Sequence, residues 1–88
     1  MRAAFVLIAV EPGRVEVVAN ALIEIEPVHE VYSISGEYDI LAKLVVDSMD
    51  DVPGVITDRI QRIPGLRRSH TLFAFPPPQG FVGHPISG

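Results

Sequence analysis

The spacing of hydrophobic positions changes along the chain and divides its first third into a strand and a helix. Residues 3–10 carry no polar side chain, as is typical of a strand covered on both faces. Pro12 and Gly13 interrupt this run, and apolar residues then recur every three or four positions over residues 14–26, which predicts an amphipathic helix ended by Pro27. The predicted buried stripe of this helix is Val15, Val18, Ala19, Leu22 and Ile25.

The middle of the chain has the alternating pattern of two strands. Residues 28–35 and 37–46 form the two runs, and the second ends in a nearly continuous apolar stretch. Gly36 lies between them, so we predict a hairpin that turns at this glycine.

A second helix and a fourth strand complete the pattern. Ser48 can cap the helix, and Asp50 and Asp51 follow in its first turn, where the helix dipole favours negative charge. Its predicted apolar stripe is Val52, Ile56, Ile60 and Ile63. Pro64 and Gly65 end it, and residues 66–75 alternate as a strand would.

The order strand–helix–strand–strand–helix–strand predicts an α+β fold of the ferredoxin-like βαββαβ type. It consists of an antiparallel four-stranded sheet with both helices on one face. The other face is apolar along the first strand and much of the third and fourth, so we expect it to pair with the sheet of a second copy, as in a dimeric α+β barrel. Residues 1–75 form this domain, and residues 76–88 form a Pro/Gly-rich tail. Phe81, Val82 and Ile86 of the tail either dock on a neighbouring subunit or belong to a flexible end.

Composition narrows the classes of function. The net charge is −4 and there is no run of basic residues, which argues against direct nucleic-acid binding. Cysteine is absent, which excludes disulfides and thiolate metal sites and favours the cytoplasm. No apolar run reaches the roughly 20 residues needed to cross a membrane.

His29, His70 and His84 lack metal-ligand spacing, and we expect His29 and His70 to be half-buried structural residues of strands. We therefore expect no catalytic site, no metal and no cofactor.

The hairpin carries the strongest candidate for binding chemistry. Ser35, Gly36, Glu37, Tyr38 and Asp39 place a hydroxyl, two carboxylates and a phenol around a glycine that lets the backbone approach a ligand. An amino acid needs acceptors for its ammonium group and donors for its carboxylate, and Asp39 and the backbone N–H groups near Gly36 can supply them. The alternative is an ordinary hairpin with polar residues at its turn.

The same residues resemble a known family. The hairpin 35–39, the stretch Ile63-Pro-Gly-Leu66 and the pair Ser69 and Thr71 are similar to motifs of the effector-binding (RAM) domain of Lrp/AsnC feast/famine transcriptional regulators. The resemblance covers residues 3–75 and carries over Gly36, Tyr38 and Asp39, with Ser69 and Thr71 as weaker matches. It implies sheet-to-sheet dimers that assemble into tetramers, octamers or rings, with amino acids or related molecules bound at subunit interfaces.

The chain departs from that family at its start. Full-length members carry a helix-turn-helix domain before the first strand, whereas Met1 leads almost directly into that strand here. The resemblance thus implies a stand-alone, non-enzymatic sensing domain that regulates transcription or metabolism indirectly, with a full-length regulator as one possible partner. Two alternatives share the topology. One is a small dimeric α+β-barrel enzyme with a cleft lined by residues such as His29, Tyr32 or His70, and the other is an ACT-like amino-acid-binding regulatory domain.

Overall fold

The computed structural model describes residues 1–75 and 83–84 and contains the predicted elements in the predicted order. The elements are β1 (Arg2–Val10), α1 (Val15–Ile23), β2 (Val28–Ser33), β3 (Ile40–Val46), the 3-10 turn η1 (Met49–Asp51), α2 (Val52–Asp58), the 3-10 turn η2 (Ile60–Arg62) and β4 (Leu66–Phe73). The predicted tail, with Phe81, Val82 and Ile86, lies outside the described residues apart from Gly83 and His84.

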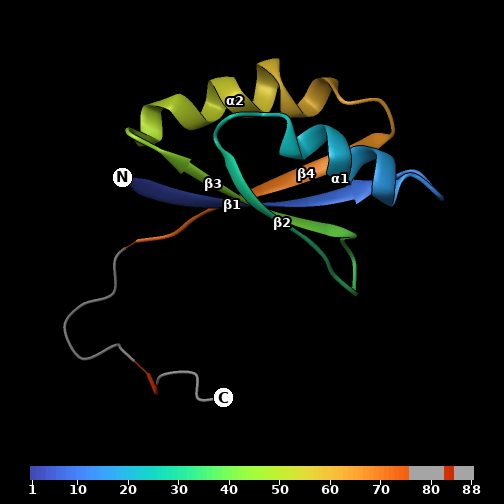
Figure 1. Ribbon diagram of the computed structural model, residues 1–88, viewed down its shortest axis with the longest axis horizontal. Coiled ribbons are helices and arrows are strands. Elements are labelled where there is room, and N and C mark those ends of the chain that lie inside the picture. The colour runs from blue at the N-terminus through green and yellow to red at the C-terminus, as the bar shows by residue number, and fades with distance from the viewer. Residues whose placement is uncertain (76–82, 85–88) are drawn as a thin grey trace.

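The four strands form one antiparallel sheet in the order β2-β3-β1-β4. Both helices lie on the same side of this sheet, and no helix or strand of residues 1–75 covers the other side (Figure 1). This is the predicted ferredoxin-like α+β sandwich. The N-terminus and the end of β4 lie at the same end of the sheet, where the Ala74 N–H donates to the Ala3 carbonyl.

The hydrophobic core fills the space between the sheet and the helices. Ala4, Val6 and Ile8 of β1 are fully buried, as are Ile40 and Leu44 of β3. Both predicted helix stripes are confirmed, because their members are buried or pack against the core. The described residues include no buried polar or charged side chain, so the core is purely apolar.

The second helical region is more irregular than the pattern predicted. Ser48 does cap its start, since its Oγ accepts a hydrogen bond from the Asp50 N–H. The helix, however, is α-helical only over Val52–Asp58, with a 3-10 turn on each side. Pro53 and Gly54 in the first turn and the β-branched residues that follow are poor helix formers. The apolar stripe survives because it depends on burial more than on ideal helix geometry.

The predicted hairpin is a longer loop. β2 ends at Ser33 and β3 begins at Ile40, so residues 34–39 lie outside both strands. The backbone N–H of Asp39 donates to the Ile8 carbonyl of β1, and the Ile34 N–H donates to the Asp39 carbonyl. The loop therefore follows the end of β1 rather than folding back tightly at Gly36.

The side of the sheet away from the helices, called here the bare face, carries the alternate side chains of the same strands. Its residues are Ala3, Phe5, Leu7 and Ala9 of β1; Leu41, Lys43 and Val45 of β3; Glu30 and Tyr32 of β2; and Arg68, His70 and Leu72 of β4. The expected apolar strip along the centre is present, with Leu72 43% and Tyr32 50% exposed at its edges.

Candidate ligand-binding site

The loop 34–39 is held against the end of β1 by the side chain of Asp39. Asp39 Oδ2 accepts a hydrogen bond of 2.9 Å from the Val10 backbone N–H, across 29 positions of sequence. Val10 lies beyond the last residue of β1 that pairs with β3, and a carboxylate that satisfies its backbone donor there stabilises the strand end. Gly36 has a φ of 121°, which L-residues rarely adopt, so the turn of this loop requires glycine.

A β-bulge brings two arginines to the same place. Ala9 pairs with Arg68 and Val10 pairs with Leu66, so Arg67 is the extra residue on β4. In a regular strand, neighbouring side chains point to opposite faces, but a bulge redirects one of them. Arg67 and Arg68 consequently line one hollow together.

That hollow has a volume of about 310 Å³ and lies between the loop 34–39, the end of β1, the β1–α1 turn and the start of β4. Charged groups of both signs line it: Glu11, Glu37, Asp39, Arg67 and Arg68. The rest of the lining is small or apolar: Ala9, Val10, Pro12, Gly13 and Val15. Among the described residues, no ion pair within 4 Å involves these charged side chains.

Arg68 also reaches the edge of the bare face. Its guanidinium carbon lies 5.2 Å from the centre of the Tyr38 ring, a cation–π distance. The Tyr38 ring in turn stacks on His70, with ring centres 6.5 Å apart. The hollow and the bare face therefore share one side chain.

The seven residues predicted from the sequence are not all brought together. Glu37 and Asp39 line the hollow, and Tyr38 lies beside it under Arg68. Ser35 and Gly36 belong to the same loop but are not part of the lining. Ser69 and Thr71 pair with Ile8 and Val6, which places them on the helix-covered side of β4, away from the hollow; Ser69 Oγ accepts a long hydrogen bond of 3.5 Å from Gln61. Their role in binding stays a prediction.

Arg67 and Arg68 are not among the site residues predicted from the sequence, because an adjacent pair is too short to count as a run of basic residues. The signal for them would have been their place at the start of the last strand. That strand runs antiparallel to β1, so its start lies beside the end of β1 that Asp39 caps. The bulge that lets both face one hollow is not readable from residue types.

The structure contains a second, larger hollow of about 360 Å³ at the opposite end of β3. It is lined by Glu26, Asp47 and Asp51 with Arg59 and His29, so carboxylates outnumber guanidinium groups three to one. A ligand carboxylate is poorly matched to that charge, and the smaller hollow is the better candidate for an amino acid despite its size.

The histidines are not part of a metal-ligating cluster within residues 1–75 and 83–84. No three metal-ligating side chains come together in this part of the chain. His29 and His70 are exposed, so the prediction that they are half-buried is wrong; each lies at a sheet edge, on β2 and β4, where no further strand covers it. His29 lines the larger hollow while Tyr32 and His70 line neither, so these three residues share no cleft.

Comparison with known proteins decides between the regulatory families. A family model described as the Lrp/AsnC ligand binding domain matches residues 3–78 of the chain. The chain belongs to the Lrp/AsnC ligand-binding domain family. This confirms the resemblance drawn from the motifs, and the regulators of the family are oligomeric and bind amino-acid effectors.

This Lrp/AsnC domain is similar to known proteins both in sequence and in structure. The HTH-type transcriptional regulator FL11 of Pyrococcus abyssi is 35% identical over 69 residues, which are 78% of this chain and 45% of that protein. The structure of TTHA0845 from Thermus thermophilus is 36% identical, with a TM-score of 0.82 over 88% of this chain and 96% of that one. Escherichia coli AsnC matches at a TM-score of 0.81 and 24% identity, over 96% of this chain and 55% of AsnC.

The Lrp/AsnC domain thus spans about half the length of the curated relatives it matches. Those relatives are transcriptional regulators, which places the chain in a regulatory rather than an enzymatic family. No helix in the described parts of the chain is long and apolar enough to span a membrane.

Proposed function

We propose that this Lrp/AsnC domain is a non-enzymatic sensor of a free amino acid or a closely related zwitterion, which binds in the hollow beside the loop 34–39. One observation carries the proposal. Two guanidinium groups and the carboxylates of Glu37 and Asp39 line one small hollow, and no ion pair among the described residues engages them. Arg67 and Arg68 match a ligand carboxylate, and Glu37 matches a ligand ammonium group.

Asp39 has a different task from Glu37 in this arrangement. One of its oxygens is bonded to the Val10 N–H, which fixes the carboxylate in place. The other oxygen remains to orient a ligand ammonium group. Because the Asp39 carboxylate is already held in place, it can orient the ligand ammonium group with little loss of conformational entropy, while the Glu37 carboxylate adjusts to the ligand.

We further propose that the sensor works as a homo-oligomer. Its bare face pairs with that of a second copy, and dimers then assemble into tetramers, octamers or rings. Since family members bind effectors as oligomers, a neighbouring subunit closes the open side of the hollow. The output passes to transcription or metabolism through a partner, of which a full-length regulator of the same family is the leading candidate. We expect this to happen in the cytoplasm, without direct nucleic-acid contact.

Thermal unfolding in the presence of each of the twenty amino acids tests the binding proposal. A ligand at 100 times its dissociation constant stabilises the folded state by about 2.7 kcal/mol and raises the melting temperature accordingly. Arg68→Gln removes a donor for the ligand carboxylate and should abolish the shift. Arg59→Gln is the matched control, since Arg59 lines the other hollow, and it should leave the shift intact.

Two results would contradict this proposal. The first is a well-folded oligomer whose melting temperature no amino acid changes. The second is a ligand shift that Arg59→Gln removes and Arg68→Gln does not, which would move the site to the larger hollow.

A further inference from the structure

The bare face is not uniformly apolar, because a lysine lies near its centre. Pairing across the strands places Glu30, Lys43, Phe5 and Leu72 in one row, and Tyr32, Leu41, Leu7 and His70 in the next. β3 and β1 are the two central strands of the sheet. Lys43 therefore lies beside Phe5 and between the apolar side chains Leu41 and Val45 of its own strand, on a surface that otherwise favours burial.

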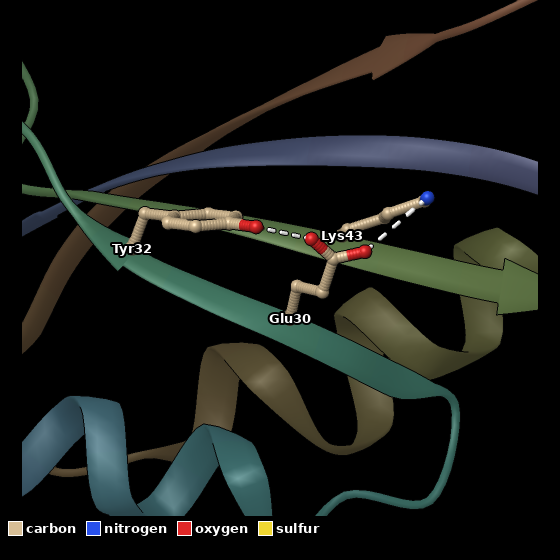
Figure 2. A network of polar contacts seen from close by, with 3 residues as sticks. All are labelled: Glu30, Tyr32 and Lys43. Carbon is tan, nitrogen blue, oxygen red and sulfur yellow. Dashed lines mark hydrogen bonds and ion pairs between the residues drawn. The ribbon is translucent and has the colours of Figure 1, made fainter. Parts of the chain in front are cut away.

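The charge of Lys43 is neutralised within the chain. Its Nζ lies 3.3 Å from Glu30 Oε2, and the Tyr32 hydroxyl donates to Glu30 Oε1 (Figure 2). Both carboxylate oxygens of Glu30 are thus occupied, whereas Lys43 has three N–H donors and uses one on Glu30. Both side chains of the ion pair are only partly exposed, 33% for Lys43 and 42% for Glu30.

Such a network does not strengthen association as an apolar residue would. Burying an ion pair in an interface roughly breaks even against hydrophobic residues of the same shape, whereas removing one partner of a buried pair is costly. Polar groups inside apolar interfaces are best known for fixing register and partner choice. An apolar strip alone permits several orientations of two sheets, and a polar group near its centre penalises those that leave its donors unpaired.

We propose that the Glu30–Tyr32–Lys43 network fixes the orientation in which the bare face pairs with that of a second copy of this chain. The network carries one positive and one negative charge, so it adds no net charge to the patch that meets its own copy across a twofold interface. The remaining Lys43 donors find acceptors on the facing copy in only one orientation. This inference rests on the sheet-to-sheet pairing proposed above, and none of the three residues of the network lines the ligand hollow.

Three variants and a distance measurement test it. Lys43→Met leaves the Glu30 charge with Tyr32 alone, and Glu30→Gln with Lys43→Met removes both charges. Arg62→Met is the matched control, an exposed cation outside the bare face. Since the chain has no cysteine, a nitroxide on Asn20→Cys, at an exposed position of α1, reports the distance between the two copies in each variant.

The expected results separate affinity from orientation. Wild type and Arg62→Met give one narrow spin–spin distance and the same dissociation constant. Lys43→Met weakens pairing by at least about tenfold, as truncating one partner of a buried pair does. The double variant dimerises with a dissociation constant within about threefold of the wild-type value. It gives more than one spin–spin distance, because a face without charged groups does not fix one orientation. Circular dichroism confirms that each variant is folded.

Several outcomes overturn the inference. If Lys43→Met changes neither the dissociation constant nor the distance, or if the double variant keeps one narrow distance, the network does not select the orientation. If the wild-type chain is monomeric, pairs only with another family member, or still pairs after Leu7→Asp, then the sheet-to-sheet pairing itself fails. The amino-acid shift is measured separately and can survive either failure.

Discussion

The two faces of the sheet use alternate residues of the same strands for different purposes. On the helix-covered face, Val6, Ile8 and Leu44 are fully buried, and no polar or charged side chain of the described residues is buried with them. On the bare face, Leu7 and Leu41 remain half-buried, and the same face carries the Glu30–Lys43 ion pair. The comparison teaches that the face with the buried apolar core defines the fold of one subunit. The bare face has apolar surface left to bury, and its Glu30–Tyr32–Lys43 network determines the orientation in which a second copy can bury that surface.

The largest expected effect comes from neighbouring substitutions on opposite faces. Ile8→Ala should lower the free energy of unfolding by roughly 2–5 kcal/mol, because it leaves a cavity among fully buried side chains. Leu7→Ala should cost well under half as much in the monomer, since Leu7 is only half-buried. Urea unfolding at protein concentrations that favour monomers measures both. Equal losses would mean that the two faces contribute alike to folding.

The second effect concerns association. Leu7→Asp puts a charge at the centre of the bare face, and we expect the dissociation constant of the dimer to rise about 100-fold or more, since a desolvated unpaired charge is costly. Sedimentation velocity over a concentration series measures this change. Val17→Asp, at an exposed position of α1 outside both faces, is the control and should leave self-association unchanged. Equal weakening by both variants would argue against pairing through the bare face.

The sequence predicted the covered face better than the bare one. The stripes Val18–Leu22 and Val52–Ile56 and the alternation of β3 follow from periodicity, because burial of apolar side chains selects one arrangement. The partners of polar side chains were not predictable in this way. Glu30 and Lys43 are 13 positions apart, and they meet only because the bulge near His29 sets the register of β2 against β3.

The same limit applies to the candidate site. The motif 35–39 could be singled out from the sequence, since glycine and a capping carboxylate have local conformational effects, and its role in binding stays a prediction. Arg67 and Arg68 join it through the bulge on β4, which depends on the packing of the β4 start. Gly65 allows that packing: with φ of 97°, it passes so close to α1 that an added Cβ would lie 3.2 Å from Arg14 Cβ.

The third prediction concerns Asp39 and tests whether its side chain stabilises the fold as well as the ligand. Asp39→Ala leaves the part-buried Val10 N–H without its acceptor and should lower the free energy of unfolding by roughly 1–3 kcal/mol. Asp39→Asn keeps an acceptor oxygen and should recover most of that loss, but it should still weaken amino-acid binding because the charge is gone. Chemical denaturation and ligand titration of both variants separate these roles. Equal stability of the two variants would show that the hydrogen bond to Val10 contributes little.

The smallest effect is the pH dependence of pairing. The hydrogen bond from Tyr32, followed by the contact with Lys43, lowers the pKa of Glu30 below its ordinary value of 4.5, and the nearby His29 acts in the same direction. A carboxyl group whose pKa is lowered keeps its charge down to that lowered value, and its protonation then leaves the Lys43 charge uncompensated on both facing copies. We therefore expect the dissociation constant of the dimer to be constant from pH 7 to about 5 and to rise roughly two- to fivefold at lower pH, less than for Lys43→Met because protonated Glu30 can still accept a hydrogen bond from Lys43. Sedimentation velocity at several pH values measures this rise. Glu30→Gln should remove most of it, because a residue that cannot titrate keeps the same partners at every pH. A rise of equal size in Glu30→Gln would assign the pH dependence to carboxylates outside the bare face.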